Sequence, residues 1–142
     1  WQEFLARYLA TRQSLVGLVL VVDARHGLAE LDCRLLASYL TSGRPVLLLA
    51  TKMDKFAPSG QREAKRVIER DVAAAFPAHV AQVAVVPFSA TRRIGIETAE
   101  AMLADWLGES EYDAGEPAPG LAKEKAPRPR GLARGPKCPR KA

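Results

Sequence analysis

Three short apolar runs alternate with four segments of helical periodicity along the first 108 residues. Val and Leu dominate the runs at residues 15–22, 46–50 and 83–87, and each run has the length of a strand. The helical segments, residues 1–12, 28–42, 59–76 and 96–107, repeat apolar positions every three or four residues. This α-β-α-β-α-β-α order predicts an α/β fold built on a three-layer parallel sheet with right-handed crossovers.

The same pattern predicts which side chains are buried. Residues 15–22 are apolar on both faces, as in a parallel strand that is covered by helices on both sides. Ser59 stands where it could cap the start of the third helix. The apolar stripe of the second helix consists of Leu28, Leu31, Leu35, Leu36, Tyr39 and Leu40, and that of the last helix of Ile96, Ala99, Met102, Leu103 and Trp106.

The periodicity stops after Gly108. Residues 109–142 are rich in Pro, Gly, Ala and charge, which predicts a disordered tail behind a single domain at residues 1–108. Most of the formal charge of +5 comes from this tail, because residues 121–142 carry +7 and residues 109–120 carry −4. The domain itself is left with +2, so the basic excess describes the tail.

Composition narrows the class of protein further. A chain with 48% hydrophobic and 26% charged residues is typical of a soluble globular protein, and not of collagen, a disulfide scaffold or a disordered chain. The longest apolar run is too short to span a bilayer and no signal peptide is visible, so we expect a cytoplasmic protein that binds no membrane. Cys33 and Cys138 fit no metal spacing, and we expect free thiols.

Polar residues follow each predicted strand at the point where the strand ends. Asp23 follows the first strand, the sequence Thr-Lys-Met-Asp at residues 51–54 follows the second, and Phe-Ser-Ala-Thr at residues 88–91 follows the third. Ligands of open parallel sheets bind outside the carboxyl ends of the strands. We therefore expect Asp23, Lys52, Asp54 and Ser89 on one rim of the sheet.

The last two of these segments suit the recognition of guanine. The Asp54 carboxylate can accept hydrogen bonds from both N1–H and the exocyclic amine of guanine, a donor pair that adenine lacks. The Lys52 stem can lie over the base, and a backbone N–H near Ser89 and Ala90 can donate to O6. The alternative is structural, with Asp54 capping a turn and Ser89 capping the next helix. Two such motifs in this order, about 35 residues apart, favour the guanine site.

The residues Asp-Ala-Arg-His-Gly-Leu-Ala-Glu-Leu-Asp at 23–32, together with these two motifs, resemble the EngB family of bacterial GTP-binding proteins over about residues 1–108. The resemblance implies GTP or GDP as ligand and the large ribosomal subunit or its rRNA as partner. It further implies a role in large-subunit assembly, with a link to cell division and septation, and no DNA partner. The guanine-site residues that it implies are Thr51, Lys52, Met53, Asp54, Phe88, Ser89 and Ala90.

The sequence departs from that family where phosphate and metal are bound. It contains no Gly-x-x-x-x-Gly-Lys-Ser/Thr loop for the β and γ phosphates, no Asp-x-x-Gly after a strand, and no switch Thr to hold Mg²⁺. In the family these segments precede the helix at residues 1–12. We therefore interpret the chain as the C-terminal half of such a GTPase, without catalytic residues or metal ligands, and expect no GTP hydrolysis by the chain alone.

Two other classes of function fit part of the sequence. A receiver-like α/β signalling domain would use Asp23 as a metal ligand, Asp54 as phosphoacceptor and Ser89 as switch hydroxyl, although the Lys that it needs at one further strand end is missing. A non-enzymatic RNA-binding fragment would act through the basic tail, and only through phosphate contacts, because residues 123–141 contain no aromatic side chain.

Two residues of the segment after the first strand have structural interpretations. His26 has no nucleophile or carboxylate pair arranged with it in the sequence, so we expect it to order its loop. Arg25 is expected to pair with a nearby carboxylate, for which Asp23, Glu30 and Asp32 are the candidates.

Overall fold

The computed structural model describes residues 2–108 and has the alternation of helices and strands that the sequence predicts. The elements are α1 (Gln2–Thr11), β1 (Leu18–Asp23), α2 (Glu30–Leu40), β2 (Val46–Thr51), α3 (Pro58–Ala75), β3 (Val83–Pro87) and α4 (Ile96–Leu107). Two short 3-10 helices, η1 (Met53–Lys55) and η2 (Pro77–Gln82), follow β2 and α3. The tail predicted for residues 109–142 lies outside the described residues.

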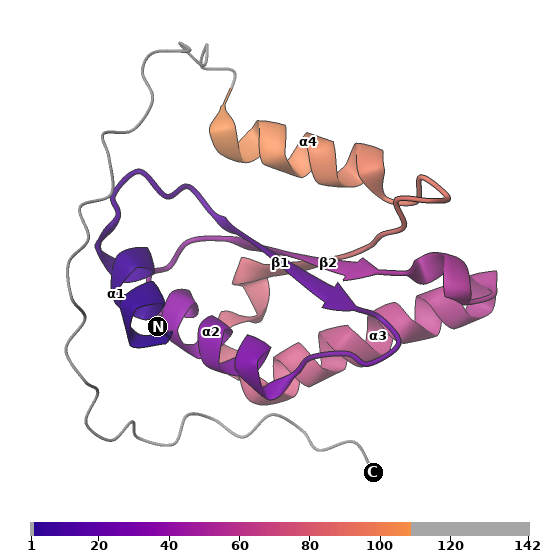
Figure 1. Ribbon diagram of the computed structural model, residues 1–142, viewed down its shortest axis with the longest axis horizontal. Helices are drawn as coiled ribbons and strands as arrows, with labels where there is room; N and C mark the ends of the chain where they lie inside the picture. The colour runs from indigo at the N-terminus through magenta and orange to yellow at the C-terminus, as the bar shows by residue number, and fades with distance from the viewer. Residues whose placement is uncertain (1, 109–142) are drawn as a thin grey trace.

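The three strands form one parallel sheet in the order β1-β2-β3. The register pairs Leu18 of β1 with Val46 of β2, and Val46 with Val83 of β3. All three carboxyl ends therefore lie at the same edge of the sheet, as Figure 1 shows. Each crossover runs through a helix, as parallel strands require.

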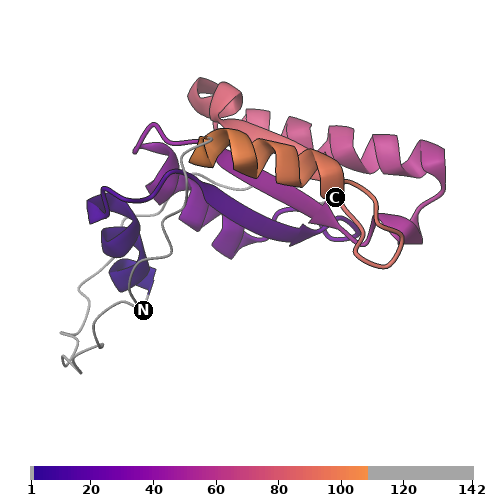
Figure 2. The same ribbon diagram turned by 90° about the horizontal axis from the view of Figure 1, so that it is seen from above.

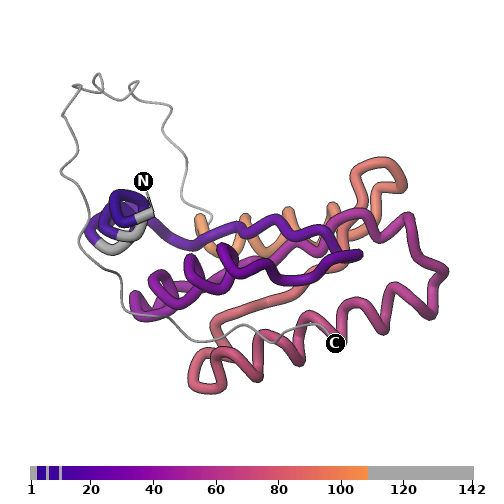
Figure 3. The backbone as a smooth tube through the Cα atoms, turned by 60° about the horizontal axis from the view of Figure 1, so that its bottom comes forward, coloured from indigo at the N-terminus to yellow at the C-terminus, as the bar shows by residue number. Residues whose placement is uncertain are grey.

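Helices cover the two faces of the sheet unequally. The central strand β2 is buried on both sides, with Val46, Leu48 and Ala50 in a large core and Leu47 in a smaller one. The large core is formed with α2 and α3, which lie on the side of the strands away from α4 (Figure 3). The smaller core is formed with α4 on the opposite face (Figure 1).

A close backbone approach fixes the end of α4 beside the start of β1. The Trp106 ring packs on Gly17, and a Cβ atom at Gly17 would lie 2.4 Å from Cε3 of that ring. No side chain larger than hydrogen fits at this position without moving the indole. The contact holds the smaller core together at the edge that β1 forms.

The prediction that the first strand is buried on both faces is wrong. Val19 and Val21 of β1 are 40% and 61% exposed, whereas Leu20 and Val22 are buried. Figure 2 shows the reason, because α4 lies over β2 and β3 and leaves the same face of β1 uncovered. As the first strand in the order, β1 also has no strand on its other side among the described residues.

Three smaller expectations are also wrong. Leu31, assigned to the buried stripe of the second helix, is 59% exposed, because the buried face of α2 is formed by Cys33, Leu36, Tyr39 and Leu40. The third helix is not capped by Ser59 but begins at Pro58, with Ala57 as its N-cap residue. Cys33 is not a free thiol, since it is disulfide-bonded.

No helix within residues 2–108 has the length and apolar character needed to cross a membrane.

Candidate functional site

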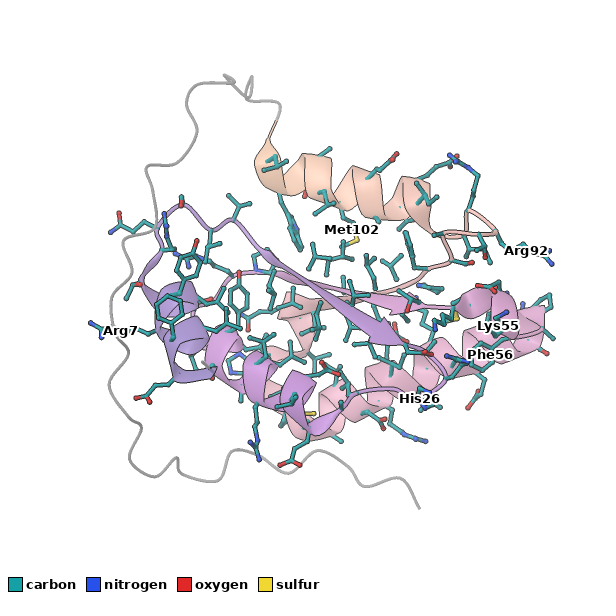
Figure 4. The ribbon with its side chains drawn as sticks, in the orientation of Figure 1. Arg7, His26, Lys55, Phe56, Arg92 and Met102 are labelled. Carbon is teal, nitrogen blue, oxygen red and sulfur yellow. The ribbon has the colours of Figure 1, made fainter. Side chains whose placement is uncertain are left out.

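The polar residues that follow the strands gather at the carboxyl edge of the sheet. Figure 4 shows His26, Lys55 and Phe56 beside the tips of the strands, with Arg92 on the neighbouring loop before α4. The four residues predicted to share this rim form two pairs in the structure. Asp54 contacts Ser89, and Asp23 contacts Lys52.

The first pair joins the two motifs that the sequence singled out. Ser89 Oγ donates a 2.6 Å hydrogen bond to Asp54 Oδ1, across 35 positions of the chain. Only 1% of Ser89 is exposed, and its hydroxyl also lies 3.1 Å from Thr91 Oγ1 and accepts from the Arg92 N–H at 3.3 Å. Two backbone hydrogen bonds of 3.0 Å each tie Ser89 to Ile94 and close the loop. The Asp54 carboxylate is thus held from one side by a preorganised hydroxyl.

This hydrogen bond also favours the ionised form of the Asp54 carboxylate. The Ser89 hydroxyl lowers the pKa of Asp54, with smaller contributions from its own backbone, from Lys55 and from Thr91, against the opposing effect of partial burial. Lys55 Nζ lies 3.7 Å from the other oxygen, Oδ2. Lys55 extends into solvent, so Oδ2 keeps lone pairs for a further donor.

Backbone hydrogen bonds fix the two motifs relative to one another. The Met53 N–H donates to the Phe88 carbonyl at 3.2 Å, and the Phe88 N–H donates to the Ala50 carbonyl at 2.8 Å. Gln61 of α3 adds a side-chain bond of 3.1 Å to the Met53 carbonyl. The Met53 side chain is fully buried in the large core, so this residue anchors the turn from below. Phe88 is half-buried and Ala90 is exposed at the rim.

The second pair lies where β1 and β2 end. Asp23 accepts hydrogen bonds from Arg25 at both carboxylate oxygens, at 3.0 Å from Nε and 2.7 Å from the terminal nitrogen. Arg25 therefore has the partner that the sequence offered as one of three. The Arg25 guanidinium lowers the pKa of Asp23 far below its usual range, despite the opposing effect of desolvation.

Lys52 extends from β2 toward this pair, a contact that the sequence did not reveal. Its Nζ lies 3.6 Å from Asp23 Oδ2, and its backbone has a φ of 61° in the left-handed region. Thr51 binds the neighbouring strand, because its Oγ1 donates to the Val22 carbonyl at 3.0 Å. The only sequence signal for the contact is that Asp23 and Thr51 end adjacent strands, which the register now pairs.

The remaining candidates contribute less. His26 is exposed, and its backbone N–H donates to the Asp23 carbonyl at 3.0 Å, within the turn that it was expected to order. Among the described residues, no group of three or more His, Cys, Asp or Glu could hold a metal ion.

Curated relatives align with most of this chain. No model of a protein family matches the chain. A curated relative, the "Probable GTP-binding protein EngB" of Laribacter hongkongensis, is 38% identical over 130 residues, which are 91% of this chain and 56% of that protein. The protein of the same name from Bordetella pertussis is 43% identical over 108 residues, 75% of this chain and 49% of its own. The chain spans about half the length of the curated relatives it matches.

Solved structures with the same arrangement of elements come from translation factors. The apo form of translation elongation factor SelB from Methanococcus maripaludis superimposes with a TM-score of 0.61 at 14% identity, over 76% of this chain and 24% of that one. A bacterial selenocysteine-specific elongation factor gives a TM-score of 0.57 at 23% identity, over 75% of this chain and 18% of its own. These likenesses confirm the predicted parallel α/β fold of the P-loop GTPase type. Over the residues that it shares with the curated relatives, the chain is similar to GTP-binding proteins of the EngB family.

Proposed function

We propose that this chain supplies the guanine-recognition part of a GTP-binding protein, with GTP or GDP as the ligand. The Asp54 carboxylate accepts hydrogen bonds from N1–H and the exocyclic amine of guanine. Adenine has no hydrogen at N1 and carries its amine at another carbon, so it leaves the carboxylate without partners. The unpaired, partly buried charge then penalises adenine binding.

The observation that supports this proposal is the 2.6 Å hydrogen bond from Ser89 to Asp54. It fixes the carboxylate before any ligand arrives, and an ionised carboxylate accepts only, as the guanine edge requires. A turn-capping Asp54 would need no buried hydroxyl from another loop. Because the acceptor is already fixed, less conformational entropy is lost when a ligand binds.

The neighbouring residues complete the proposed site. The unbranched stem of Lys52, whose side chain is 53% exposed, lies against the face of the base while the ammonium stays hydrated. A backbone N–H near Ser89 and Ala90 donates to guanine O6, where adenine presents a donor of its own. Thr51, Met53 and Phe88 hold these groups in position from the strand ends.

The test compares nucleotides that differ only in the base. Binding of GMP, AMP and XMP to the full chain is measured by NMR titration. We expect GMP to bind about tenfold or more tightly than AMP. Asp54→Asn should weaken GMP and favour XMP, because the amide N–H donates to the xanthine 2-oxo group. Asp105→Asn makes the same chemical change on the exposed side of α4 and should alter nothing. Equal affinities of the unaltered chain for GMP and AMP would disprove the proposal.

Phosphate binding and hydrolysis belong to the proposal only as properties of a larger protein. The family resemblance implies Mg²⁺ beside the phosphates, but the residues described here include no group that fits such an ion. Within residues 2–108, the proposed role of the side chains is to bind and orient the base.

We propose further that the partner is the large ribosomal subunit or its rRNA, in the cytoplasm, during subunit assembly. Only the family resemblance supports this, and the link to cell division and septation has the same basis. Co-sedimentation of the full chain with 50S particles, with and without GTP, tests it. Deletion of residues 109–142 is the informative variant, since unchanged association would exclude a role of the basic tail.

The sequence favours guanine recognition over a receiver-like domain. Oδ2 of Asp54 is open to a phosphoryl group because Ser89 donates to Oδ1, but the Lys that a receiver-like domain needs at one further strand end is missing. Incubation with acetyl phosphate followed by mass spectrometry distinguishes the two. An aspartyl phosphate on Asp54 would favour the receiver-like function.

A further inference from the structure

A second carboxylate controls the Lys52 side chain beside the proposed guanine site. We propose that Asp23 is a positioning residue, which holds the Lys52 stem across the place where the base binds. This inference rests on the proposed function and assigns a role to a residue outside the two recognition motifs. It begins from the 3.6 Å separation between Lys52 Nζ and Asp23 Oδ2.

The backbone brings these two side chains together. Asp23 and Thr51 are register partners at the ends of β1 and β2, so Lys52 is the first residue beyond the paired strands. At Lys52 the chain turns through the left-handed region, with φ 61° and ψ 31°. The turn leads into η1 and Asp54, while the Lys52 side chain reaches back to the neighbouring strand end.

Arg25 makes Asp23 a fixed point and not a mobile counter-ion. Its backbone N–H and Nε both donate to Oδ1 at 3.0 Å, and its terminal nitrogen donates to Oδ2 at 2.7 Å. Such two-oxygen contacts with a guanidinium define the carboxylate plane. The charges facing Asp23 are Arg25 and Lys52, and Asp54 in turn acts on Arg25. The direct contacts of the Arg25 guanidinium are with Asp23.

The position of Lys52 affects one part of recognition only. Contact between an aliphatic stem and the face of a purine does not depend on which groups the purine edge carries. Hydrogen bonding to Asp54 does depend on them. Loss of Asp23 should therefore weaken guanine and adenine nucleotides by the same factor, whereas loss of Asp54 changes their ratio.

A double-mutant cycle on the full chain tests this inference, with GMP and AMP affinities as the readout. Asp23→Asn and Lys52→Met should each weaken GMP about two- to fivefold, the range for a solvent-exposed ion pair, and leave the GMP/AMP ratio unchanged. The double variant should be no weaker than either single one. Glu30→Gln, which removes the surface ion pair with Arg34, is the matched control and should have no effect.

The outcomes separate this inference from the proposed function. No preference for GMP in the unaltered chain contradicts the proposed function. A GMP preference with independent, multiplying effects of the two substitutions contradicts the positioning role alone, because Asp23 then acts only on its own loop. Circular dichroism checks that Asp23→Asn folds.

If that variant does not fold, ¹³C NMR of labelled lysine gives the answer without it. Two distinct Lys52 ε-proton signals are expected when GMP is bound, and one averaged signal would overturn the inference.

Discussion

Replacement of Gly95 by alanine tests how the loop before α4 shapes the site. Gly95 follows Ile94, whose backbone binds Ser89, and it is the N-cap residue of α4. Its φ is +75°, and a Cβ atom there would lie 2.0 Å from the Pro87 carbonyl oxygen. Backbone strain and a steric clash therefore act together, and neither can relax without moving β3 or α4.

Two further glycines separate these contributions. Gly43 has a φ of +72°, but a Cβ atom would meet nothing closer than Gln82 Nε2 at 3.9 Å, so Gly43→Ala introduces strain without a clash. Gly60 lies in α3 with only ordinary contacts, the nearest being Phe56 Cβ at 3.4 Å. Strain costs about 1–2 kcal/mol and is partly offset by the lower entropy of the unfolded chain. We expect Gly43→Ala to destabilise by about 0.5–1 kcal/mol and Gly60→Ala to stabilise by about 0.5–1 kcal/mol.

The clash adds a further cost at Gly95, and overpacking of this kind typically costs about 1–3 kcal/mol. The expected loss for Gly95→Ala is therefore about 1.5–4 kcal/mol. Urea unfolding followed by circular dichroism gives the three differences from midpoints at a common slope. A Gly95→Ala variant no less stable than Gly43→Ala would refute the reasoning, because the Pro87 contact would then cost nothing.

The other predictions concern Ser89, the acidic groups and the edge strand. Ser89→Ala should lower the free energy of unfolding by about 1–2 kcal/mol, because the Asp54 carboxylate and the Arg92 N–H then lose their partner at a buried position. Thermal melts measure the loss. Ser59→Ala changes an exposed serine and should have little effect. The folded-state pKa values of Asp23 and Asp54 lie below the usual 3.8, so their stabilising contribution is complete above about pH 5 and is lost as the pH falls through the lowered values. Urea midpoints measured between pH 2 and 7 should therefore fall only below about pH 4. A fall centred near neutral pH would contradict this assignment. Val21 is 61% exposed on an edge strand, so Val21→Lys should reduce light scattering at high protein concentration without lowering the melting temperature. Unchanged scattering would exclude this face as the site of association.

Most of the fold could be predicted because its signals are local. Strand positions follow from short Val and Leu runs, and helix positions from apolar repeats, within a few residues of the observed bounds. The errors arise where burial depends on distant parts of the chain. Nothing in residues 15–22 indicates that α4 covers β2 and β3 but not Val19 and Val21. The start of α3 is set by Pro58, whose fixed φ suits the first helical position. Ser59 therefore lies inside the helix and does not cap it.

The candidate site was only partly predictable for the same reason. Asp54 and Ser89 could be placed on one rim because parallel strands end at one edge, although a 2.6 Å hydrogen bond is a detail of loop closure through Ile94. The contact of Lys52 with Asp23 depends on a left-handed backbone at a non-glycine residue. Side-chain type gives no signal for such a conformation, since lysine seldom adopts it.

At Lys52, the left-handed turn makes stability and ligand recognition favour different residues. Glycine adopts the φ of 61° found at Lys52 without the steric cost that any larger residue incurs. Lys52→Gly should therefore make the protein harder to unfold while it removes the stem that would contact a base. If the proposed function holds, the more stable glycine variant is therefore the one that loses the contact with the base.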